Sequence, residues 1–252
     1  MLPQIHLGPV TVNTFGLALA AAFLCSGYLF RRRLAELGRP PDWAYEAVLA
    51  AAVGGIVGAH LDWLVQNWDQ TSQNLLGSVF SGTGLVFFGG LLGGIVGVGL
   101  WASRRGYFGL ELFDVGAPAV AIGYAVGRIG CQLAGDGDYG IPSNLPWAMA
   151  YPNGTVPEFR PVHPTPIYEL LVMGAVTAVL WRVRRRVAPG ELFALYLVLG
   201  GVERFLIEFI RRNQELAAGL SLPQFVAVAM VIAGGAWLTR GYRVRGLAGV
   251  RA

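Results

Sequence analysis

The sequence predicts an all-α integral membrane protein with about seven transmembrane helices and an ordered outer loop region. Of its 252 residues, 54% are hydrophobic and 13% charged, and the mean hydropathy is +0.53. Soluble domains average about 25% charged residues. Seven apolar runs also approach the roughly 20 residues that a helix needs to cross a bilayer. We expect residues 1–252 to form a single transmembrane domain.

The apolar runs follow one another at regular intervals. They lie at residues 14–30, 45–65, 84–102, 112–133, 165–182, 191–210 and 221–239. The first is not expected to be a cleavable signal peptide, because nothing basic precedes it and three arginines follow it. The second and third are rich in glycine and alanine, which suits close helix packing in lipid.

Every basic residue is an arginine, and most arginines follow the first, third, fifth and seventh runs. These are Arg31, Arg32, Arg33, Arg39, Arg104, Arg105, Arg182, Arg184, Arg185, Arg186, Arg240, Arg243, Arg245 and Arg251. Because cytoplasmic loops carry the excess of arginine, the pattern predicts an outer N-terminus and a cytoplasmic C-terminus. The net charge of +4 therefore reflects topology and anionic lipid at the inner face, and not nucleic acid.

Two of the expected outer loops are long, at residues 66–83 and 134–164. The second is rich in glycine, proline and aromatic residues. A loop of this length without helical periodicity is typically functional or disordered. Aromatic residues at a membrane interface favour an ordered cap here.

Arg128 is the most informative residue, because it lies inside an apolar run. A charge at such a depth costs roughly 3 kcal/mol or more, so it usually faces a partner or a substrate. Glycines and the polar residues Asp136, Asp138 and Tyr139 follow it. The segment therefore predicts a site for an anionic ligand within the membrane.

Most other polar residues of the runs also fall near the outer ends of the predicted helices. They are His60, Asp62, His163, Tyr168, Glu169, Arg204, Glu208 and Arg211. The spacing of four and three puts Arg204, Glu208 and Arg211 on one helix face. A purely structural alternative is that Arg204 pairs with Glu208 while Arg128 pairs with an aspartate.

Two arginines at headgroup depth suit a phosphodiester, because guanidinium groups bind phosphate oxygens in a bidentate fork and stay charged. The apolar walls would then hold acyl chains, which indicates phospholipid handling. Cys25 and Cys131 are interpreted as small buried side chains. We expect no metal cluster and no cofactor.

Several segments in this order resemble the motifs of one family. They are His6–Val10, Asn13–Leu17, Gly84–Gly93, Gly127–Gly130, Asn144–Pro152, His163–Glu169 and Arg204–Arg211. Together, over nearly the whole chain, they resemble the prolipoprotein diacylglyceryl transferases, the bacterial enzymes that begin lipoprotein maturation.

The chain departs from the family pattern at several positions. Phe88 stands where the family usually has histidine, and Cys131 where it has asparagine. The other departures are Phe15 for tyrosine, His60 for arginine, Ala134 for asparagine, Asp136 for glutamate, and one added residue at Gly137–Asp138. The chain therefore resembles a divergent branch that retains Arg128 and Arg204.

The resemblance implies transfer of a diacylglyceryl group from phosphatidylglycerol, or a similar anionic phospholipid, to the lipobox cysteine of a prolipoprotein signal peptide. It implies a multi-pass protein of the bacterial inner membrane. Arg128, Arg204 and Glu208 are the expected catalytic residues. The expected substrate-binding residues are His60, Phe88, Gly127, Gly130, Gly135, Asp136, Asp138, Tyr139, Gly140, His163, Tyr168, Glu169 and Arg211. His163, Asp138 and Glu208 are alternative general bases, and Cys131 is treated as a packing residue.

Two other functions remain open. One is a related membrane enzyme that uses a phospholipid donor with a different acceptor, as the changes at Phe88 and Cys131 suggest. The other is a lipid or anion transporter with the same buried arginines. A transporter of that kind would need alternating access, for which the sequence shows no internal repeat.

Overall fold

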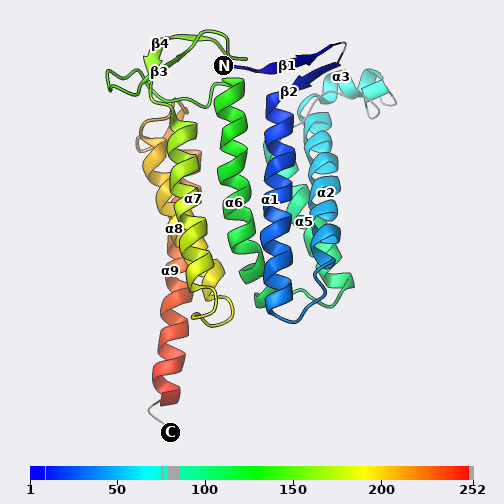
Figure 1. Ribbon diagram of the computed structural model, residues 1–252, viewed down its shortest axis with the longest axis vertical. Helices are drawn as coiled ribbons and strands as arrows, with labels where there is room; N and C mark the ends of the chain where they lie inside the picture. Colours follow the sequence, from blue (N-terminus) through cyan, green and yellow to red (C-terminus); the bar gives the residue numbers. More distant parts are fainter. Residues whose placement is uncertain (9, 75–76, 79–85, 250–252) are drawn as a thin grey trace. The chain divides into compact units, whose positions relative to one another are not determined.

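The computed structural model describes residues 1–8, 10–74, 77–78 and 86–249 (Figure 1). The chain divides into two compact units, which are described separately. The first comprises Met1–Phe30 and Phe113–Ala252, and the second comprises Arg31–Leu112. The expectation of a single domain therefore stays a prediction.

Each predicted apolar run coincides with a long helix. The helices are α1 (Thr14–Glu36), α2 (Trp43–Gln66), α5 (Phe87–Arg104), α6 (Leu110–Ala134), α7 (Thr165–Val183), α8 (Glu191–Glu208) and α9 (Leu222–Gly249). The predicted start of the third run, at residue 84, lies outside the described residues. A short helix, α3 (Trp68–Gln73), follows α2.

Within the described residues, five helices are long and apolar enough to cross a membrane, which agrees with a multi-pass membrane protein. They are α1, α2, α6, α7 and residues Leu222–Gly241 of α9. Helix α8 is more polar, since its 18 residues include Glu191, Glu203, Arg204 and Glu208. The count of seven spans stays a prediction.

In the second unit, α2 packs along α5 through glycines on both helices. A Cβ atom on Gly54 would lie 2.3 Å from the carbonyl oxygen of Gly93, and one on Gly58 would lie 2.3 Å from that of Gly89. The two backbones approach this closely only because neither face carries side chains there. The backbone N–H of Gly89 also donates to Asp62 Oδ2 at 2.9 Å.

In the first unit, α8 packs against α7 and α9. Small residues of α6, spaced four apart, pack with larger side chains of α7 and α8. The buried members of this core are Ala117, Ala121, Ala125, Met173, Val176, Leu180 and Leu192. Four-residue spacing keeps the alanines on one face, so α6 presents a smooth surface to the core.

Among its described residues, the first unit also contains three antiparallel two-stranded sheets. They pair β1 (Gln4–Leu7) with β2 (Val10–Asn13), β3 (Met149–Tyr151) with β4 (Glu158–Val162), and β5 (Glu215–Ala217) with β6 (Leu220–Ser221). The β3–β4 hairpin lies between α6 and α7 in the chain (Figure 1). It packs Tyr151 and Val162 with Tyr139. The ordered loop expected in residues 134–164 stays a prediction.

Candidate functional site

Charged side chains from four segments of the first unit meet in what we call the ionic cluster. Its members are Arg128 of α6, Asp138 of the following loop, Glu169 of α7, Arg204 and Glu208 of α8, and Arg211 just beyond α8. All six were predicted site residues. Three guanidinium groups meet three carboxylates, so the formal charges cancel.

Glu169 lies at the centre of the ionic cluster, and its side chain is 0% exposed. Its Oε2 is 2.5 Å from Arg128 Nε. Its Oε1 is 3.3 Å from Arg204 Nη1 and 3.2 Å from Arg211 Nη1. One buried carboxylate therefore holds arginines from three segments together, as a buried charge requires paired partners.

Asp138 bridges two of these arginines from the loop side. Its Oδ2 accepts from Arg128 Nη1, and its Oδ1 accepts from Arg211 Nη2. Burial alone would raise the pKa of Asp138, but the charges of Arg211 and Arg128 bring it below its usual value overall. Asp138 is therefore a stable anion and a weak proton acceptor.

Asp136 lies two residues away in a different environment. Its Oδ1 accepts the backbone N–H of Asp138 at 3.2 Å. Burial, and then the negative charge of Asp138, raise the pKa of Asp136 above its usual value. The two neighbouring aspartates are therefore not equivalent, which sequence spacing alone did not predict.

Arg204 and Glu208 form the predicted i,i+4 pair, with Arg204 Nη2 2.9 Å from Glu208 Oε2. The other Glu208 oxygen, Oε1, accepts from Ser221 Oγ and from Asn213 Nδ2, each at 2.6 Å. These contacts fix Glu208 in place, so it orients Arg204. The Arg204 side chain is 22% exposed, the most of the three arginines.

Sequence reasoning missed two residues beside the ionic cluster. Tyr124 Oη accepts from Arg128 Nη2 at 2.8 Å, and the guanidinium lies 4.7 Å from the centre of its ring. The signal was its position four residues before Arg128, on the same helix face. Glu203 is buried on α8, and in the described structure its Oε1 has no hydrogen-bond partner.

The glycines of the predicted site lie in α6 and in the loop that follows it. Gly135 and Gly137 have φ values of +59° and +96°, which favour glycine. A Cβ atom on Gly140 would lie 2.4 Å from the carbonyl oxygen of Ile210, and one on Gly130 would lie 2.9 Å from Ala18 Cβ. A Cβ atom on Gly127 would have no neighbouring heavy atom of the described residues within 4 Å.

The remaining predicted residues of the first unit lie around the loop and not in the ionic cluster itself. His163 Nδ1 is 3.3 Å from Tyr168 Oη, which in turn accepts from Trp147 Nε1 at 2.7 Å. Tyr139 Oη donates to the carbonyl of Val156 at 2.9 Å. These contacts order the loop region.

His60 and Phe88 belong to the second unit. His60 stacks on Trp63 with ring centres 6.0 Å apart, and the side chain of Phe88 is exposed. Their assignment to substrate binding stays a prediction.

Among the described residues, three side chains that could bind a metal ion lie close together, whereas the sequence predicts no metal cluster. Donor atoms of Cys131, Asp136 and Asp138 lie within 4.8 Å of one another. Two arginines already bind Asp138, and Arg128 Nη1 also donates to Cys131 Sγ at 3.7 Å. The positive charges of these arginines oppose the binding of a metal ion at this group. Cys25 and Cys131 are both free thiols.

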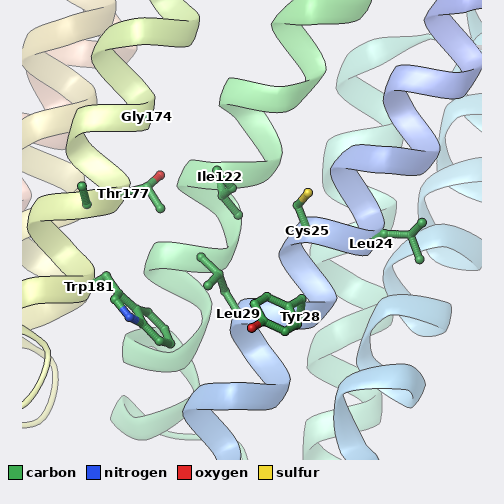
Figure 2. A pocket seen from close by; sticks show the side chains of 9 residues that line it. Leu24, Cys25, Tyr28, Leu29, Ile122, Gly174, Thr177 and Trp181 are labelled. Carbon is green, nitrogen blue, oxygen red and sulfur yellow. The ribbon is translucent and has the colours of Figure 1, made fainter.

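A separate pocket of about 490 Å³ lies between α1, α6 and α7 (Figure 2). It is lined by Leu24, Cys25, Tyr28, Leu29, Ile122, Gly174, Thr177, Ala178 and Trp181. None of these side chains is charged, so the pocket offers no partner for an anionic headgroup. Its lining suits hydrocarbon.

The helices and the ionic cluster define a multi-pass membrane protein with a buried site of paired arginines and carboxylates. The model of the family described as prolipoprotein diacylglyceryl transferase matches residues 3–240. The chain therefore belongs to this family.

Relatives named phosphatidylglycerol–prolipoprotein diacylglyceryl transferase cover most of the chain. The protein of Chromohalobacter salexigens is 34% identical, over 91% of this chain and 88% of the relative. That of Methylobacillus flagellatus is 33% identical over 93% of each. That of Leptospira interrogans is 30% identical, over 86% of this chain and 76% of the relative.

Proposed function

We propose that the chain transfers the diacylglyceryl group of phosphatidylglycerol to the lipobox cysteine thiol of prolipoprotein signal peptides, in lipoprotein biogenesis. The names of its relatives support the donor and the acceptor class. The single observation that carries the proposal is the ionic cluster, in which three arginines from α6, α8 and the segment after α8 converge on Glu169.

In this reaction the acceptor thiolate attacks the glyceryl carbon, a C–S bond forms, and the C–O bond to phosphate breaks. The electron pair of that bond leaves with glycerol phosphate, so negative charge grows on the phosphate oxygens. Arg128 and Arg204 would hold the phosphate and stabilise that charge, as preorganised donors do in a site that excludes water. Nearby cations also lower the pKa of a thiol, which favours the acceptor thiolate.

Among the three candidate bases, we propose His163. Asp138 and Glu208 are engaged in ion pairs with arginine, which suits positioning better than proton transfer. His163 is the remaining candidate. The other predicted residues of the loop, from Gly135 to Gly140, would surround the headgroup.

The same proposal includes seven spans in the bacterial inner membrane, with the N-terminus outside and the C-terminus in the cytoplasm. This arrangement would put the ionic cluster at the depth of the outer headgroups. The arginines in the C-terminal parts of α1, α5, α7 and α9, and those that follow α1, α5 and α7, support it.

The test is an in vitro transfer assay. Purified protein, phosphatidylglycerol and a synthetic lipobox peptide are incubated, and the peptide mass is followed. We expect a diacylglyceryl mass shift that disappears when the peptide cysteine is replaced by serine. Arg204→Ala should lower the rate about 100-fold or more. A folded Arg204→Ala protein with normal rates would contradict the role of Arg204.

A related enzyme with another acceptor is the alternative, since Phe88 and Cys131 replace family residues. Lipid turnover without a peptide product, with an active family member positive in parallel, would favour it. Transport without turnover would favour a transporter.

A further inference from the structure

Arg128 has a partner at each of its three guanidinium nitrogens. Nε lies 2.5 Å from Glu169, Nη1 donates to Asp138, and Nη2 donates to Tyr124 at 2.8 Å. A guanidinium has five N–H groups, and these partners together with Cys131 face four of them. A bidentate contact with a phosphodiester needs two N–H groups. Phosphate binding at Arg128 must therefore replace at least one existing partner.

Exposure indicates which partner leaves. The side chain of Glu169 is 0% exposed and contacts three arginines, whereas the side chain of Asp138 is 31% exposed. Moving Glu169 would leave several buried charges without a partner, which is strongly unfavourable. The Asp138 side chain is partly exposed to solvent, so it is the partner whose side chain can rotate away from Arg128.

The backbone contacts of Asp138 do not depend on the position of its side chain. Its N–H donates to Asp136 Oδ1 at 3.2 Å, and its carbonyl oxygen accepts from Thr165 Oγ1 at 2.5 Å. Rotation about the Cα–Cβ bond moves the carboxylate and keeps both contacts. Release of Asp138 therefore requires no opening of the loop.

The Asp138 carboxylate also resembles a phosphodiester in charge and geometry. It carries one negative charge, and its two oxygens accept from Arg128 Nη1 and Arg211 Nη2. Exchanging it for a singly charged phosphodiester leaves the charge balance of the two arginines unchanged. Adding a phosphate beside it would instead put two anions on the same donors, which is unfavourable at this burial.

We propose that Arg128 and Arg211 form a phosphate-binding site that the Asp138 carboxylate fills in this structure and leaves when a phosphodiester binds. Asp138 is thus a resident counter-ion, and Arg211 joins Arg128 as a direct phosphate ligand. The inference rests on the proposed function for the identity of the ligand as the lipid donor.

The test is a binding titration of the purified full chain with the short-chain lipid dihexanoylphosphatidylglycerol. Because the resident carboxylate must leave first, the apparent Kd is the intrinsic Kd divided by the fraction of protein in which the site is free. We expect Asp138→Asn to lower the Kd about fivefold or more. The matched control is Glu158→Gln, which removes one carboxylate charge from β4, where Glu158 pairs with Arg160 and Arg212, and should change the Kd less than about twofold.

A second neutral variant, Asp138→Ser, serves as a check in case Asp138→Asn does not fold. It should also bind the lipid more tightly than the parent chain does. Arg211→Gln should weaken binding as Arg128→Gln does. Inorganic phosphate should compete more strongly in Asp138→Asn than in the parent chain if the phosphate, and not the acyl chains, displaces the carboxylate. Equal competition in the two proteins would contradict the exchange.

The outcomes separate this inference from the proposed function. Folded Asp138 variants that bind no more tightly than the parent, while Arg128→Gln and Arg204→Gln bind weakly, would overturn the counter-ion role and leave the donor site intact. Normal lipid binding by both arginine variants would instead overturn the donor site itself.

Discussion

Glu169 links three arginines that are far apart in the sequence, and its side chain is wholly buried. Removing its charge leaves an excess of positive charge in a region with little water. Loss of one member of a buried ion pair typically costs about 3–5 kcal/mol. At the residue scale, Glu169 is therefore the structural centre of the site.

We predict that Glu169→Gln lowers the thermal unfolding midpoint in detergent well below that of the parent, by an amount corresponding to roughly 3 kcal/mol. The control is Glu111→Gln, which breaks a 2.8 Å pair with Arg39 whose side chains are 45% and 37% exposed. Exposed pairs contribute about 1 kcal/mol or less. Equal shifts in the two variants would refute the central role of Glu169.

The two loop aspartates should affect stability with opposite dependence on pH. The pKa of Asp138 is lowered in the folded protein, so its contribution is present above its ordinary value of 3.8 and is lost as the pH falls through the lower folded pKa. The pKa of Asp136 is raised, so its contribution is present below 3.8 and is lost as the pH rises through the folded pKa.

We therefore predict that at pH 7 Asp138→Asn is less stable than the parent, whereas Asp136→Asn is as stable or more stable. The deficit of Asp138→Asn should shrink as the pH falls below 3.8. Thermal unfolding of the three proteins across the acid range measures this. Parallel curves for the two variants would contradict the difference between these environments.

At the scale of elements, α2 and α5 depend on glycines where their backbones meet. Gly54 and Gly55 are neighbours in α2 but face different surroundings. A Cβ atom on Gly54 would lie 2.3 Å from the Gly93 carbonyl oxygen, whereas one on Gly55 would lie 3.5 Å from that of Gly90. Only a side chain at Gly54 would therefore require α2 and α5 to separate.

We predict that Gly54→Ala destabilises the protein by about 1–3 kcal/mol, the usual cost of overpacking. Gly55→Ala should be neutral or slightly stabilising, because alanine favours helix more than glycine does. Thermal unfolding of both variants in the same detergent makes the comparison. A Gly54→Ala protein as stable as Gly55→Ala would show that close backbone contact does not hold this helix pair.

At the scale of the whole molecule, orientation in the membrane is the testable property. We predict that a cysteine at Asn153, an exposed residue of the loop after β3, reacts with a membrane-impermeant maleimide in intact spheroplasts. A cysteine at Arg186, an exposed residue after α7, should react only after permeabilisation. The parent chain, with Cys25 and Cys131, gives the background. If the cysteine at Arg186 reacted in intact spheroplasts and the one at Asn153 only after permeabilisation, the proposed topology would be wrong.

The positions of the long helices were predictable from the sequence. Runs such as 165–182 and 112–133 correspond to α7 (Thr165–Val183) and α6 (Leu110–Ala134) within two residues. Apolar length is a local property, and a helix satisfies its own backbone hydrogen bonds in lipid. The pair Arg204–Glu208 was predictable for the same reason, since helix geometry alone sets its spacing.

The membrane class, the helices and most residues of the site are predictable from the amino-acid sequence. The packing of the folded chain establishes that Glu169 binds three arginines, that Asp138 and not Asp136 bridges two of them, and that Tyr124 lies against Arg128. These contacts join separate segments, so they depend on how α6, α7 and α8 pack. A carboxylate's partners and pKa follow from that packing and not from its neighbours in the chain.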